Sequence, residues 1–187
     1  MDGRVDTDPD AGLVARIGRG DRAAAQSLMA RHLPKMLILA RRMLAGRGEA
    51  DAEDAVQEAF LKVWLHAGRW RPGKAKFETW LYRVVLNQCY DRLRKKPLVA
   101  LEAAAEVPDP SPLPGSRLEA AELAAEVENA LARLPERQRA ALLLCHFEEM
   151  SNIAAAEVLG LSVEALESLL ARGRRSLKTM LVHLKES

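Results

Sequence analysis

The 187-residue sequence is poor in aromatic residues, which form only 4% of the chain. Alanine and leucine dominate it instead, together with many glutamates and arginines. These residues favour helices, and they leave little material for a β-sheet, which draws on aromatic and β-branched side chains. We therefore expect an all-α protein.

Cysteine is also scarce. Cys89 and Cys145 lie far apart, so we expect neither a metal site nor a disulfide framework, and the chain fits a reducing compartment. Cys89 belongs to an apolar helical stripe and is predicted to be an inert core thiol.

Long apolar segments are missing as well, since no run approaches the roughly 18 residues of a membrane span. The N-terminus is acidic, with Asp2, Asp6, Asp8 and Asp10, whereas a signal peptide begins with basic residues. These features predict a cytoplasmic protein that has no metal or cofactor and does not insert directly into a membrane.

The net charge of +2 conceals an asymmetry between the two halves of the chain. Residues 1–96 hold 19 lysines and arginines against 12 acidic residues, a balance of +7, whereas residues 97–187 hold 9 against 14, a balance of −5. A basic half of this kind indicates contact with a polyanion.

A proline-rich stretch separates the two halves. Five prolines and Gly115 fall between Pro97 and Arg117. Each proline removes a backbone donor and disfavours helix in the preceding residue, and a packed domain rarely tolerates an unstructured segment of this length. We therefore predict two small helical domains, residues 1–96 and 118–187, joined by a linker over residues 97–117.

Hydrophobic periodicity predicts four helices in each domain. Pro34 is expected to kink or break the second of them. Gly160-Leu161-Ser162 joins the last two, which Ser151 and Ser162 can cap, so this pair matches a helix-turn-helix. The predicted helices cover residues 11–18, 22–44, 52–67, 77–95, 118–133, 135–147, 151–159 and 163–185.

Five of the ten residues from Glu49 to Glu58 are acidic and none is basic. Acidic residues interact favourably with the macrodipole at a helix N-terminus, so one interpretation is a cap and a solvated face. The other is a docking surface for a basic partner, because the polar face continues beyond what capping needs. The candidate docking residues are Asp51, Glu53, Asp54, Gln57 and Glu58.

Basic and aromatic residues alternate in the loop before residue 77, and polar residues continue along the helix that follows it. Cations follow phosphates and aromatic rings stack on unpaired bases, so the pattern is typical of single-stranded nucleic-acid binding. A solvated basic face with core tryptophans is the alternative. The candidate contacts are Arg69, Trp70, Lys74, Lys76, Arg83, Asn87, Tyr90 and Arg94.

The second helix of a helix-turn-helix lies in the major groove, where its first turns touch bases. Here that helix carries a polar face and ends in a basic cluster. Glu167 cannot bind phosphate, although it could accept a hydrogen bond from cytosine N4. The candidate contacts are Glu164, Glu167, Ser168, Arg172, Arg174 and Arg175.

Catalytic motifs are nearly absent from the sequence. Cys145 and His146 are adjacent, but neighbours on a helix point about 100° apart and do not face each other. No glycine-rich phosphate loop and no nucleophile motif is present. We therefore expect no enzymatic activity; an enzyme that uses Cys145 or a histidine is the weakest of the interpretations.

Four motifs resemble the extracytoplasmic-function (ECF, group 4) sigma factors of the sigma-70 family. Residues 51–60 (DAEDAVQEAF) resemble region 2.2, and residues 77–87 with 91–95 resemble regions 2.3 and 2.4. Residues 134–139 (LPERQR) resemble the start of region 4, and residues 156–163 (AEVLGLSV) its helix-turn-helix. The motifs stand in the correct order on both sides of the linker.

The resemblance implies a protein that binds the RNA polymerase core and directs promoter-specific transcription initiation. The acidic docking residues would bind the clamp helices of the β′ subunit, and the basic loop with its helix would melt and capture the −10 element. Region 4 would read the −35 element and contact the β flap. An anti-sigma factor normally holds the family inactive, so the protein would join the nucleoid only when active.

Region 4 departs from the family pattern at Glu167 and Leu169, where many relatives carry basic residues, and near Ala154, where an acidic residue is usual. These departures bear on which −35 sequence is read. The alternative function is a stand-alone helix-turn-helix regulator of transcription, which would leave the acidic segment and the basic loop unexplained.

Overall fold

The structure is a computed structural model that describes residues 8–71, 73, 75–95 and 115–182, with side chains in the last range from Leu123 onward. Over these residues the chain is helical and has no strand, which confirms the predicted all-α fold class. The elements are α1 (Ala11–Ile17), α2 (Arg22–Met43), α3 (Glu49–His66), α4 (Phe77–Arg94), α5 (Gly115–Ala132), α6 (Glu136–Leu142), the π-helical turn η1 (Leu143–Phe147), α7 (Asn152–Leu159) and α8 (Val163–Met180).

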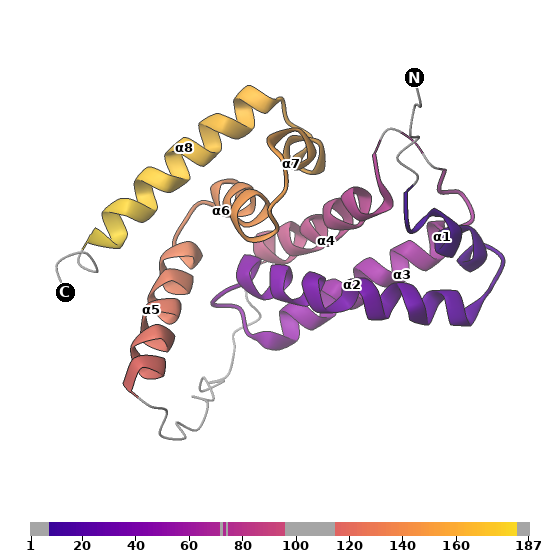
Figure 1. Cartoon of the computed structure of the whole chain (residues 1–187), viewed down its shortest axis with the longest axis horizontal. Coiled ribbons are helices and arrows are strands. Elements are labelled where there is room, and N and C mark those ends of the chain that lie inside the picture. The colour runs from indigo at the N-terminus through magenta and orange to yellow at the C-terminus, as the bar shows by residue number, and fades with distance from the viewer. Residues whose placement is uncertain (1–7, 72, 74, 96–114, 183–187) are drawn as a thin grey trace.

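Helices α1 to α4 form an N-terminal bundle in which α3 packs against both α2 and α4 (Figure 1). Of the expected kink or break at Pro34, a break is excluded, since α2 continues through this residue. Pro34 and Ala30 are both exposed, so the Ala30 carbonyl that loses its donor can bond to water. The α3 helix begins at Glu49, earlier than predicted, directly after Gly48 with its positive φ of 98°.

Two aspartates before α1 fix this segment to α2 and α4. Asp8 accepts a hydrogen bond from the backbone N–H of Phe77, the first residue of α4, and so caps a helix far away in the sequence. Asp10 is 2% exposed; its carboxylate accepts from Arg31 and lies 2.8 Å from Nε2 of His32, both on α2. The chain start thereby holds the beginning of α4 in place.

Replacing Asp10 by alanine is expected to lower the free energy of unfolding by about 1–3 kcal/mol, the usual loss when a buried polar group is left without its partner. His32 is buried and would face a methyl group. Urea unfolding followed by circular dichroism measures the change. The matched control is Asp91→Ala, whose exposed pair with Arg94 should matter by less than about 0.5 kcal/mol. Equal losses in the two variants would contradict the proposed role of Asp10.

Helices α7 and α8 form the predicted helix-turn-helix. Ser151 caps α7 by accepting from the backbone N–H of Ala154 at 3.2 Å, and Ser162 caps α8 by accepting from Ala165 at 3.2 Å. Gly160 adopts the left-handed conformation at the end of α7, with a φ of 64°, which glycine tolerates without strain. Both predicted caps and the turn are therefore confirmed.

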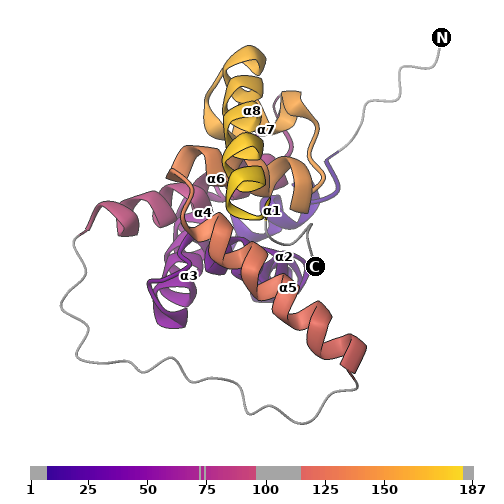
Figure 2. The same ribbon diagram turned by 90° about the vertical axis from the view of Figure 1, so that its left-hand side faces the viewer.

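The predicted linker, residues 97–117, lies outside the described residues except at its end, because α5 begins at Gly115. After it, α5 to α8 form a C-terminal bundle that packs on the N-terminal one (Figures 1 and 2). Helix α7 contacts α4, and α5 and α6 contact α2. The buried apolar residues of both bundles consequently form one continuous core.

Arg139 of α6 is one buried polar link between the bundles. It is 5% exposed, and its guanidinium donates to the carbonyls of Met43 at 2.6 Å, of Leu134 at 3.2 Å and of Ala132. Met43 and Ala132 are the last residues of α2 and α5, where the helix macrodipole is negative. One cation therefore stabilises two helix ends that belong to different bundles.

Tyr82 and Arg83 of α4 make a second link. The Tyr82 hydroxyl donates to the carboxylate of Glu148, and burial, followed by this carboxylate, raises the pKa of Tyr82, which keeps the hydroxyl protonated. Arg83 donates to the carbonyls of Glu157 and Val158 at the end of α7. The helix-turn-helix is thus bonded to the helix that carries the predicted nucleic-acid contacts.

Candidate polymerase and nucleic-acid interfaces

An apolar groove runs between α2 and α3. Three predicted docking residues, Glu53, Asp54 and Gln57, stand along its α3 side and are exposed. Apolar surface beside acidic groups suits a partner helix with apolar and basic side chains. The apolar lining consists of Met29, Leu33, Leu37, Val56, Phe60, Leu61 and Trp64, of which Leu61 is 54% exposed.

The other two predicted docking residues lie outside this groove. Asp51 is half-buried in the first turn of α3, where the macrodipole favours its charge. Glu58 is directed to α4, and its carboxylate lies 3.0 Å from the guanidinium of Arg92. Since the Arg92 side chain is only 11% exposed, this ion pair connects α3 to α4. Glu58 therefore already has a structural partner within the chain.

The basic loop presents Arg69 and Lys76 at the surface. Trp70 is half-buried, and the edge of its ring packs against Phe77, with centroids 5.8 Å apart and planes at 82°. Trp80 packs on the same Phe77 at 5.6 Å. Trp70 is therefore partly packed into the core, as the alternative interpretation expects. The predicted contact Lys74 lies outside the described residues.

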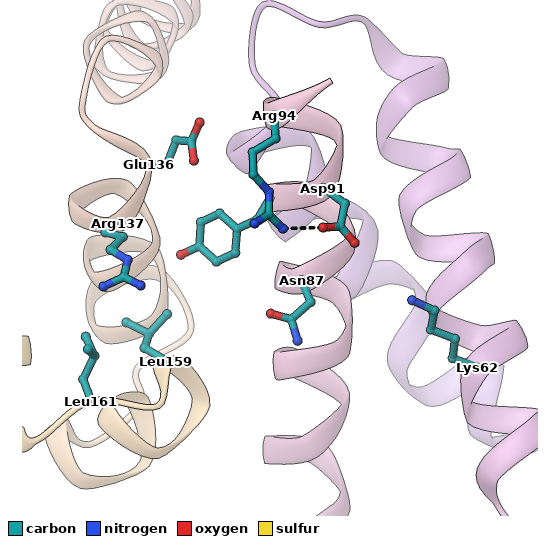
Figure 3. A pocket seen from close by; sticks show the side chains of 9 residues that line it. Lys62, Asn87, Asp91, Arg94, Glu136, Arg137, Leu159 and Leu161 are labelled. Atoms are coloured by element: carbon teal, nitrogen blue, oxygen red, sulfur yellow. Dashed lines mark hydrogen bonds and ion pairs between the residues drawn. The ribbon is translucent and has the colours of Figure 1, made fainter. Parts of the chain in front are cut away.

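Three of the four candidates on α4, Asn87, Tyr90 and Arg94, line a cleft between the two bundles, shown in Figure 3, whereas Arg83 is bonded to α7 outside its lining. Asn87 is exposed and points into this cleft, and Arg94 pairs with Asp91 beside it. Tyr90 also lines the cleft, but its hydroxyl is buried without a hydrogen-bond partner and burial raises its pKa to about 12. The opposite wall comes from the C-terminal bundle and consists of Glu136, Arg137, Leu159 and Leu161.

All six candidates on α8 are exposed: Glu164, Glu167, Ser168, Arg172, Arg174 and Arg175. They differ in what holds their side chains. The Glu164 carboxylate accepts hydrogen bonds from its own backbone N–H and from the Ser162 hydroxyl. These bonds lower the pKa of Glu164 and make its carboxylate part of the α8 cap. Glu167 instead accepts a hydrogen bond from Asn152 of α7 at 3.2 Å. Sequence reasoning missed Asn152.

The two cysteines differ in accessibility. Cys89 is fully buried, so its predicted core position is confirmed, and burial raises its pKa to about 12 despite the nearby Arg92. Cys145 is half-buried, and burial raises its pKa while Arg174 acts in the opposite direction. Within the described ranges, no three His, Cys, Asp or Glu side chains are placed to share a metal ion, and no helix could span a membrane.

Comparison with known proteins identifies both bundles. Residues 28–97 match the model of Sigma-70 region 2, and residues 124–177 match that of Sigma-70, region 4. The ECF RNA polymerase sigma factor SigM of Mycobacterium tuberculosis is 37% identical over 94% of this chain and 86% of its own length. The RNA polymerase sigma factor CnrH of Cupriavidus metallidurans is 33% identical over 93% of this chain and 95% of its own.

A solved structure of CnrH in complex with the cytosolic domain of CnrY superposes with a TM-score of 0.68 at 31% identity, covering 93% of this chain and 97% of that one. The chain belongs to the extracytoplasmic-function sigma factors of the sigma-70 family. Sigma factors are not enzymes; the chain binds the RNA polymerase core and directs transcription initiation at promoters.

Proposed function

We propose that this sigma factor works through three separate surfaces. The groove between α2 and α3 binds the clamp helices of the polymerase β′ subunit. The loop over residues 68–76 and the exposed side of α4 melt and capture the −10 element, and α8 reads the −35 element while its bundle contacts the β flap. Residues 1–96 and 118–187 would be the two functional domains, with residues 97–117 as the linker.

The observation that carries the proposal is the groove beside Glu53, Asp54 and Gln57. An exposed apolar groove has no role in a protein that only binds DNA, and acidic residues along it would repel phosphates. Both features instead suit a protein partner with basic and apolar side chains. A stand-alone regulator of transcription would not need this surface.

The packing of the bundles adds a conformational step. Arg83 is bonded to α7, and Asn87 faces the C-terminal bundle across the cleft. A DNA strand that reaches these side chains has to enter between the bundles. We therefore infer that the C-terminal bundle moves away from α4 when the polymerase and the promoter are bound.

Control by an anti-sigma factor is part of the proposal. CnrH, a relative at 31% identity over most of the chain, is found with the cytosolic domain of CnrY. A partner of this kind would keep the present chain in the cytoplasm from reaching the DNA of the nucleoid until the chain is released. The packing of the C-terminal bundle against α4 supports an inactive state of this kind, because it covers one side of α4.

A reconstituted run-off transcription assay tests the function. Bacterial core polymerase is combined with a library of promoter fragments, with and without the protein. Specific transcripts that require the protein, together with binding to core in the absence of DNA, are expected. DNA binding without any affinity for the core polymerase would favour the stand-alone regulator instead.

A further inference from the structure

Glu167 is the unusual residue on the recognition helix, because a carboxylate cannot contact DNA phosphates favourably. It lies in the second turn of α8 and is exposed. The nearby acid Glu164 is already used at the helix start, where it bonds its own N–H and Ser162. Of these two acids, Glu167 is thus the one available to meet a base edge.

Asn152, the first residue of α7, fixes one side of this carboxylate. Its Nδ2 donates to Oε1 of Glu167 at 3.2 Å, and its Oδ1 lies 3.9 Å from Sγ of Cys145. The Cys145 thiol has a raised pKa, so it stays protonated at neutral pH and donates to the amide oxygen. The amide therefore turns its NH₂ toward Glu167, and Oε2 stays available for a second donor.

We propose that Glu167 is a specificity-determining residue that selects cytosine in the −35 element, and that Asn152 is the positioning residue that aims its carboxylate. This inference rests on the proposed function of α8. In the major groove, only cytosine and adenine present an amino donor. Adenine places the N7 acceptor beside its amino group, which would repel the second carboxylate oxygen, whereas cytosine has a C–H group there. Guanine and thymine present acceptors and are excluded.

The test uses holoenzyme assembled from core polymerase and the full chain. Promoter fragments keep a fixed −10 element and carry a randomised −35 element, and transcribed fragments are sequenced. The wild-type protein is expected to prefer cytosine at one position by about tenfold. Glu167→Gln should shift that position to adenine, because a glutamine amide can bond N6 and N7 together. Asn152→Ala should keep the preference for cytosine but reduce it severalfold at that position alone.

Lys178→Ala serves as the comparison, because Lys178 is exposed near the end of α8, beyond the candidate base contacts, and loss of a phosphate contact lowers transcription from all fragments without changing base preferences. If Glu167→Gln leaves the selected sequences unchanged, or weakens every fragment equally, the inference is wrong and the Asn152–Glu167 bond only joins α7 to α8. If the wild-type protein gives no protein-dependent transcripts from any fragment, the proposed function itself fails.

Discussion

Replacing Asp54 by lysine is expected to weaken binding of the core polymerase about 100-fold, because like charges opposed across an interface cost several kcal/mol. Asp54 is exposed beside the groove between α2 and α3, and its replacement breaks no ion pair among the described residues. Replacing Glu58, in contrast, would break its ion pair with Arg92. Lysine is also a good helix former, so stability should be nearly unchanged. Fluorescence anisotropy with labelled protein and core polymerase, without DNA, gives the affinity.

The matched control for this charge reversal is Asp91→Lys. Asp91 is exposed on α4, outside the groove and outside the bundle proposed to contact the β flap, and the substitution changes the net charge by the same amount. The effect of Asp54→Lys should also shrink at high salt, since exposed charges are screened. If both variants bind core polymerase equally well, the acidic segment acts only as a helix cap and a solvated face.

The acidic segment shows what helical spacing alone can predict about the five candidate docking residues. On a helix with 3.6 residues per turn, Asp51 and Glu58 are turned roughly 100° away from the mean direction of Glu53, Asp54 and Gln57. That spacing does not divide the five candidates cleanly, because Asp54 lies only about 40° from Glu58 and about 100° from Glu53. It could not have identified Arg92 as the partner of Glu58, because this contact depends on how α4 packs against α3.

The helix-turn-helix was predictable because its determinants are local. Ser151, Gly160 and Ser162 each act within a few residues of their own position, as caps or as a left-handed turn. The tertiary contacts of Asp8 with Phe77 and of Arg139 with Met43 join residues that are far apart in the sequence. No periodicity or motif spacing encodes such pairs, so only the structure reveals them.

The packing of the bundles could not be predicted for the same reason. Arg83 was expected to face nucleic acid, and in the structure its guanidinium bonds the carbonyls at the end of α7. A surface arginine is equally suited to phosphate and to the negative end of a helix. Sequence therefore indicates what Arg83 can bind, while the arrangement of the bundles decides which acceptor it meets.

Replacing Asn87 by alanine is expected to reduce promoter-specific transcription by at least about tenfold and leave the affinity for core polymerase unchanged. A bidentate contact to a base edge is worth about 1–3 kcal/mol of discrimination. Asn87 lies on α4 in the cleft between the bundles, whereas the groove proposed to bind core polymerase is formed by α2 and α3. Run-off transcription and core binding, measured on the same protein preparation, separate the two activities.

Asn129→Ala is the matched control, because Asn129 is an exposed helical asparagine on α5, outside both the cleft and α8. Its transcription should equal that of the wild-type protein. A parallel loss of core binding and transcription in Asn87→Ala would place Asn87 at the polymerase interface and not at the −10 element. Retained core binding with lost transcription would mean that DNA reaches Asn87, although the C-terminal bundle faces this side chain across the cleft. That result would support separation of the two bundles during initiation.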